Sequence, residues 1–148
     1  MYETLKFIHV MAVIAWFGGG IFLTALAGRA ARTDTAALGT VVRLGGAMGP
    51  FFGAMGGIAF LAGIAMVLTT DGLDFEEAWI TIGIVVYLVS AFLGGRVLGP
   101  RYERLGEAAA GGDAAATETA RKAVVSITMV DLTLLTIAVA AMVFKWGA

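Results

Sequence analysis

Residues 7–28 read FIHVMAVIAWFGGGIFLTALAG, an apolar run in which the one ionisable side chain is that of His9. A helix needs about 20 predominantly apolar residues to cross a hydrocarbon core of about 30 Å. The run therefore predicts a first transmembrane helix over residues 7–28. Because an ionisable group inside a bilayer is costly, His9 is also the first candidate for a functional residue.

Three further apolar runs follow, at about residues 50–70, 78–98 and 123–144. The chain has 148 residues, of which 59% are hydrophobic and 14% are charged, whereas soluble domains have about 45–50% and about 25%. The excess of apolar residues lies in the four runs. We expect residues 1–148 to form a single all-α domain, a polytopic membrane protein with a four-transmembrane-helix bundle in the lipid bilayer.

The basic side chains predict how this bundle is oriented. Eight of them lie after the first run or between the third and the fourth: Arg29, Arg32, Arg43, Arg96, Arg101, Arg104, Arg121 and Lys122. Only Lys6 and Lys145 lie on the other side, where the loop 71–77 reads DGLDFEE. By the positive-inside rule, the linkers 29–49 and 99–122 are cytoplasmic and both termini are outside. The pattern predicts a multi-pass protein of the bacterial inner membrane.

The start of the second helix has two interpretations. Pro50 suits the first turn of a helix, where its missing N–H group is harmless. Alternatively, the helix begins near Thr35 after an Asp34 cap and kinks at Pro50. The Ala- and Gly-rich stretch 106–122 is read as a linker whose second half extends the fourth helix.

Glycines four residues apart form a stripe on the second helix, at Gly45, Gly49, Gly53 and Gly57. Small residues let membrane helices approach closely, so the stripe predicts a packing groove for a neighbouring helix. The alternative is room for a flat cofactor against exposed backbone. A groove of this kind also favours a homo-oligomer or a membrane-protein partner.

His9 shares a helix face with Trp16, about one turn below the outer end of the first helix. One interpretation is a structural histidine near the interface that bonds a neighbouring polar group. The other is an axial ligand to haem b or another hydrophobic cofactor. Met66 and Met142 lie in the same leaflet and are the depth-matched partners for such a ligand.

Asp131 lies about two turns inside the cytoplasmic end of the fourth helix. A carboxylate at this depth should face protein or water and have a partner. His9 lies in the opposite leaflet, so we expect Arg96, near the cytoplasmic end of the third helix, to be that partner. Asp131 is either a structural tie or a carboxylate that carries protons or ions.

This chain lacks the residues that several classes of function require. With no cysteine there is no disulfide, thiolate ligand or iron–sulfur cluster. A net charge of −1 gives no reason to expect a nucleic-acid partner. Neither a Walker motif nor HExxH is present, and Asp131 lies too far in depth from His9 for a hydrolase triad. The sequence names no reaction.

The opening LKFIHVMAVIAWFGGGIFLTALAGR, together with GGRVLGP at residues 94–100, resembles an uncharacterised family of bacterial four-helix integral membrane proteins. That resemblance covers nearly the whole chain and implies no activity. The His9 and Trp-x-Gly pattern is more distantly similar to HemJ-type protoporphyrinogen oxidases and to copper-resistance membrane domains. In the HemJ-type family the first-helix histidine is implicated in haem binding, which would fall on His9. The chain departs from that family at Leu26–Arg29, where a Pro-Arg step is expected.

Three functions remain open on these grounds. The first is a membrane protein that binds haem or another hydrophobic cofactor through His9. The second is a structural or assembly protein that oligomerises through the glycine stripe. The third is a small transporter or channel that uses Asp131.

Overall fold

The computed structural model describes residues 1–33 and 35–147, and these residues form helices joined by short connections. The elements are α1 (Tyr2–Val13), η1 (Ile14–Gly18), α2 (Gly19–Thr33), α3 (Thr35–Thr69), α4 (Ala78–Phe92), η2 (Leu93–Leu98), α5 (Gly99–Ala110) and α6 (Ala114–Phe144). Because η1 and η2 are short π-helical segments inside longer helices, these elements make four long rods. Within the described residues, four helices are long and apolar enough to cross a membrane.

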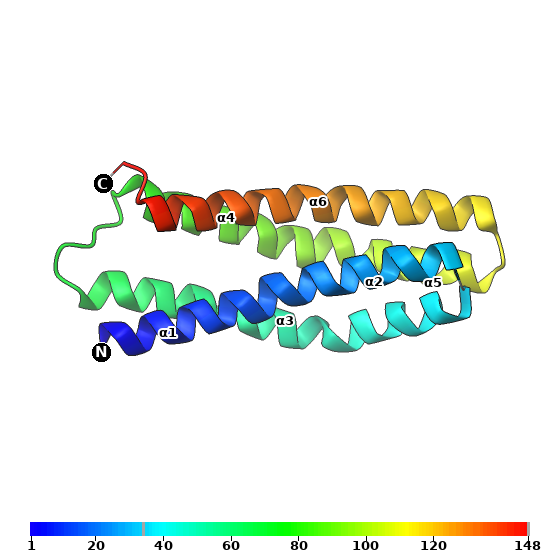
Figure 1. The fold of residues 1–148 in the computed structure, drawn as a ribbon, viewed down its shortest axis with the longest axis horizontal. Coiled ribbons are helices and arrows are strands. Elements are labelled where there is room, and N and C mark those ends of the chain that lie inside the picture. The colour runs from blue at the N-terminus through cyan, green and yellow to red at the C-terminus, as the bar shows by residue number, and fades with distance from the viewer. Residues whose placement is uncertain (34, 148) are drawn as a thin grey trace.

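The four rods lie side by side in an elongated bundle (Figure 1). Both termini and the α3–α4 connection are at one end, which we call the outer end. The α2–α3 and α5–α6 connections are at the opposite, inner end, where most of the basic residues also lie. This arrangement agrees with an even number of spans, and the side of the membrane that each end faces remains a prediction from the charges.

The second rod begins at Thr35 and runs through Pro50 as one helix to Thr69. Of the two starts that the sequence left open, the structure has the earlier one. A proline inside a helix removes one backbone hydrogen bond, and the helix accommodates this loss without ending. The proposed cap, Asp34, lies outside the described residues.

The rods are longer than a bilayer requires. Helix α6 has 31 residues, which corresponds to about 46 Å at about 1.5 Å per residue, against a hydrocarbon core of about 30 Å. Much of the expected linkers 29–49 and 99–122 is therefore helical, within α2, α3, α5 and the first turns of α6. These segments lengthen the bundle at the inner end, and from the helix lengths we expect them to lie beyond the hydrocarbon core.

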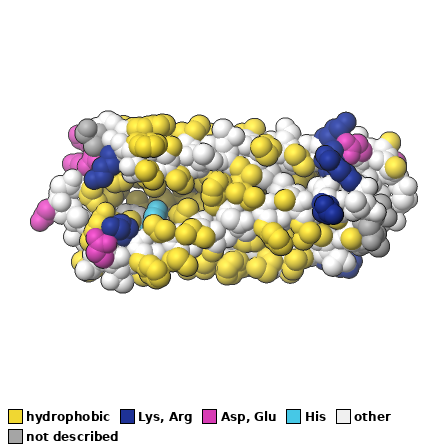
Figure 2. Space-filling view, viewed as in Figure 1, with side chains coloured by type: hydrophobic (Ala, Val, Ile, Leu, Met, Phe, Trp, Pro, Cys, Tyr) yellow, Lys and Arg dark blue, Asp and Glu magenta, His cyan; other side chains and the backbone are white. Residues whose placement is uncertain are grey.

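The best-packed core lies in this inner extension. Its buried residues come from four elements, α2, α3, α5 and α6: Ala27, Ala30, Leu38, Val41, Leu105, Ala109 and Val124. Leu38 and Leu105 are both 0% exposed. Farther toward the outer end, large apolar side chains such as Phe7, Leu61 and Phe92 face outward. Figure 2 shows this apolar belt between the charged groups at the two ends.

The helices separate into two pairs toward the outer end. There α1 packs against α3 and α4 packs against α6, while neither α4 nor α6 packs closely on α1 over the described residues. At the inner end, by contrast, α2 packs on α3, α3 on α5, α5 on α6 and α6 on α2, which closes the bundle. The separation of the pairs leaves a space inside the outer half of the bundle.

Candidate functional site

A cavity of about 590 Å³ occupies the space between the two helix pairs. Its walls come from α1 and η1, α3, α4 and α6, and almost all of the lining side chains are apolar or aromatic. Volumes of about 300–1,000 Å³ are typical of sites for cofactors and other small molecules. In the space-filling view the bundle is hollowed in its outer half, and His9 is visible in the hollow (Figure 2).

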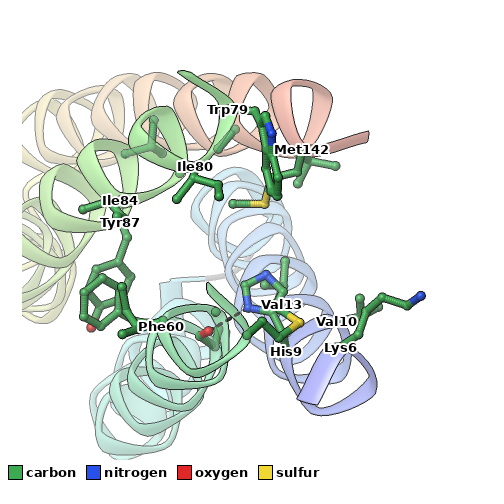
Figure 3. Close-up of a pocket in the computed structure, with 18 of the residues that line it drawn as sticks. Lys6, His9, Val10, Val13, Phe60, Trp79, Ile80, Ile84, Tyr87 and Met142 are labelled. Atoms are coloured by element: carbon green, nitrogen blue, oxygen red, sulfur yellow. Dashed lines mark hydrogen bonds between the residues drawn. The ribbon is translucent and has the colours of Figure 1, made fainter. Parts of the chain in front are cut away.

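His9 is fixed in this cavity by a hydrogen bond to the backbone. Its Nδ1 lies 2.7 Å from the carbonyl oxygen of Ala59 on α3. Because a carbonyl oxygen can only accept, Nδ1 carries a proton and donates it, which leaves Nε2 as the ring nitrogen without a protein partner in this bond. Figure 3 shows the ring turned into the cavity, with Met142 on the opposite side. His9 therefore presents Nε2 to a largely apolar space.

The Ala59 carbonyl can reach His9 because the residue four positions later is a glycine. In a helix, the side chain at i+4 lies over the carbonyl of residue i, and Gly63 has none. A Cβ atom built on Gly63 would lie 3.3 Å from Nδ1 of His9 and 3.4 Å from its Cε1. Gly56 leaves space for Trp16, whose ring lies 3.4 Å from the Cβ position, although no hydrogen bond among the described residues accompanies this contact. Sequence reasoning missed both glycines, although their seven-residue spacing marks one helix face.

Three aromatic rings close the deep side of the cavity. Phe60 stacks on Tyr87 with 4.3 Å between ring centroids, and Trp16 meets Tyr87 edge-on at 5.8 Å. They come from η1, α3 and α4, so this cluster ties the two helix pairs together below the cavity. Figure 3 shows Phe60 and Tyr87 together on one side of the space.

Polar groups gather at the outer margin of the cavity. Lys6 lies 2.9 Å from the carboxylate of Glu3 and is 49% exposed. Lys145, at the end of α6, lies 6.0 Å from the centre of the Trp79 ring, within cation–π range. The indole N–H of Trp79 donates to Glu77. Both lysines line the cavity, so it has a rim with charged side chains of both signs and an apolar interior.

The structure brings together the four residues that the sequence proposed for a cofactor. His9, Trp16, Met66 and Met142 all line this one cavity. Of the two methionines, Met142 lies on α6, across the cavity from His9 (Figure 3). Met66 lies on α3, the helix that also carries Ala59.

Asp131 and Arg96 lie elsewhere, and their expected pairing is wrong. Asp131 accepts a hydrogen bond from Ser90 on α4, whereas Arg96 is exposed in η2. Arg96 lies six residues after Ser90, about 9 Å farther along the helix. Ser90, and not Arg96, therefore lies at the depth of the Asp131 carboxylate. Neither Asp131 nor Arg96 lines the cavity.

The glycine stripe does not form a groove for another helix of the same chain. Only Gly45 has a neighbour, Leu23 at 4.0 Å from its Cβ position, and nothing lies within 4 Å of that position at Gly49, Gly53 or Gly57. Gly49 and Gly53 are exposed on the outside of the bundle. The close contacts are made instead by Gly56 and Gly63, on a different face of α3.

Four long apolar helices around an internal cavity define a small polytopic integral membrane protein. A family model described as "Predicted integral membrane protein (DUF2269)" matches residues 3–146, and the chain belongs to that family. No curated protein and no solved structure matches the chain. The more distant resemblance to HemJ-type oxidases and copper-resistance domains finds no support in these comparisons.

Proposed function

We propose that this protein binds a hydrophobic cofactor, haem b, in the outer cavity, with His9 as the axial ligand. The observation that carries the proposal is the bond from His9 Nδ1 to the Ala59 carbonyl. Metal-binding histidines usually donate their second ring N–H to a carbonyl or carboxylate, which orients the ring and makes the other nitrogen a better ligand. His9 has this arrangement, with Nε2 directed into an apolar space.

The side chains available as metal ligands favour haem over a bare metal ion. No cluster of three or more His, Asp or Glu side chains suited to a metal lies within residues 1–33 and 35–147. Iron held here would therefore need a macrocycle that supplies its other ligands. Met142 offers a thioether across the cavity, and His/Met ligation is an established haem type. Lys6 and Lys145 at the rim would pair with the propionates.

The absorption spectrum tests this proposal. Protein expressed with a haem precursor and purified in mild detergent should show a Soret band, and His9→Ala should lower haem content at least tenfold, because the ligand is lost. Met142→Leu should alter the spectrum, because it removes the thioether that would hold the iron together with His9. Met66→Leu, a change of the same size elsewhere in the cavity wall, is the control and should keep the wild-type spectrum.

Two results would contradict haem binding at this site. One is a folded wild-type protein that shows no Soret band after haem supplementation. The other is a band of equal strength in His9→Ala. Elution on size exclusion and the thermal unfolding midpoint confirm that each variant is folded, so that loss of haem reports on the ligand.

We further propose that the protein forms homo-oligomers in the bacterial inner membrane through the glycine stripe. The open space at Gly49, Gly53 and Gly57 supports a contact with a second copy, since small residues allow helices to approach closely in lipid. Gly53→Leu should shift the protein to a smaller species in detergent, measured by light scattering. Ala54→Leu, at the next exposed position, should not. A monomeric wild type would overturn this second proposal.

A further inference from the structure

A second groove runs along the outside of the bundle between α2 and α6, at the inner end. The part of the groove nearer the middle of the bundle is lined by apolar or small residues on both helices: Ile21, Ala25 and Gly28 on α2, and Val125, Met129 and Leu132 on α6. Nothing lies within 4 Å of a Cβ atom built on Gly28, so the groove is open at that point.

Three arginines line the other end of the same groove, namely Arg29, Arg32 and Arg121. Arg121 is only 12% exposed and is held by Glu118 through two hydrogen bonds of 2.7 Å. Arg29 and Arg32 form no ion pair with an acidic side chain within residues 1–33 and 35–147. The groove therefore has an excess of positive charge at its inner end, where basic side chains gather in Figure 2.

The dimensions and polarity match one lipid molecule. From Ile21 to Arg32 the helix rises about 17 Å, close to half of a hydrocarbon core of about 30 Å. An acyl chain would lie along the apolar part, and an anionic headgroup would meet the guanidinium groups. Arginine binds phosphate oxygens with paired hydrogen bonds, and basic pockets between membrane helices on the cytoplasmic side bind anionic headgroups.

We propose that the α2–α6 groove is a binding site for an anionic phospholipid of the inner-end leaflet. Arg29 and Arg32 bind the phosphate, and Arg121 is positioned beside them by Glu118. One acyl chain fills the groove past Gly28. This site is separate from the His9 cavity, with which it shares no lining residue, so it holds whether or not haem is bound.

Native mass spectrometry can measure lipid binding directly. The detergent-purified protein is titrated with phosphatidylglycerol and, separately, with phosphatidylcholine of the same acyl chains. The wild type should retain phosphatidylglycerol preferentially. Because one basic side chain near an anionic headgroup changes affinity about fivefold, Arg29→Gln with Arg32→Gln should weaken binding about 25-fold. Arg104→Gln, an exposed arginine at the same end but outside the groove, should have little effect.

The Gly28→Leu variant tests whether lipid binding needs the shape of the groove or only its positive charge. This variant keeps all three arginines and fills the apolar part, so it should also lose phosphatidylglycerol, while Gly94→Leu, at an open and exposed position outside the groove, should bind like the wild type. Equal retention of the two lipids by the wild type would overturn the proposal. Unchanged binding in either the double arginine variant or Gly28→Leu would do the same, as would full displacement of the lipid by millimolar glycerol phosphate.

Discussion

Replacing Gly63 with leucine is expected to remove ligand binding in the outer cavity and to lower the free energy of unfolding by about 2–4 kcal/mol. The first Cβ atom would already lie 3.3 Å from Nδ1 of His9, and the rest of the side chain would occupy the space of the ring. Overpacking of this kind costs about 1–3 kcal/mol. The lost bond to Ala59 adds about 1 kcal/mol, since both partners would be left unpaired in an apolar site.

Thermal unfolding in detergent and the haem content together measure this effect. Gly63→Ala should be milder, because a movement of a few tenths of an ångström by the imidazole relieves its contact. Gly94→Leu is the matched control, since it adds the same side chain to a helix at an exposed position where nothing lies within 4 Å. A Gly63→Leu protein that unfolded at the same temperature as Gly94→Leu and kept the cofactor would contradict the close approach of α1 to α3 at His9.

Leu105→Ala is expected to lower the free energy of unfolding by about 2–5 kcal/mol, as in well-packed soluble cores. Leu105 is 0% exposed and lies among buried residues of α2, α3 and α6 in the inner extension. Because the charged side chains of the expected linkers lie in this part of the bundle, we expect its alternative environment to be water rather than lipid. The full hydrophobic effect therefore acts on it, together with the cost of the cavity left behind.

Leu61→Ala is the control for this second prediction. Leu61 is 66% exposed and belongs to the apolar belt, so its truncation exchanges one lipid contact for another and should change stability by well under 1 kcal/mol. Thermal midpoints in detergent compare the two variants. If Leu105→Ala had the same thermal midpoint as Leu61→Ala, the inner end would contribute little to stability.

The four spans could be predicted because each is an apolar run of bilayer length. Their true ends could not, because the extensions contain charges and glycines that are typical of linkers. The segments around Leu38 and Leu105 are helical because both side chains pack into the same buried core at the inner end. Such a contact between distant residues cannot be read from the local sequence. Pro50 was ambiguous for the same reason, since a long helix with neighbours tolerates the loss of one hydrogen bond.

The candidate site was only partly predictable. Depth along the helices brought His9, Trp16, Met66 and Met142 together, because residues at one depth of a bundle lie close to one another. The partner of His9 was hidden, since a backbone carbonyl has no sequence signature and is marked only by the glycine four residues later. For Asp131 the same reasoning predicted a charged partner, Arg96. It missed Ser90, whose hydroxyl lies at the same depth as the carboxylate.

The two helix pairs are held together at two levels, by the α2, α3, α5 and α6 core at the inner end and by the rings of Trp16, Phe60 and Tyr87 below the cavity. From Trp16 to Tyr2 the first rod rises about 21 Å beyond the ring cluster. A change of about 5° in the angle between the pairs at these rings would move the outer end of the rod by about 2 Å. The width of the opening beside His9 therefore depends on how three aromatic rings pack below it.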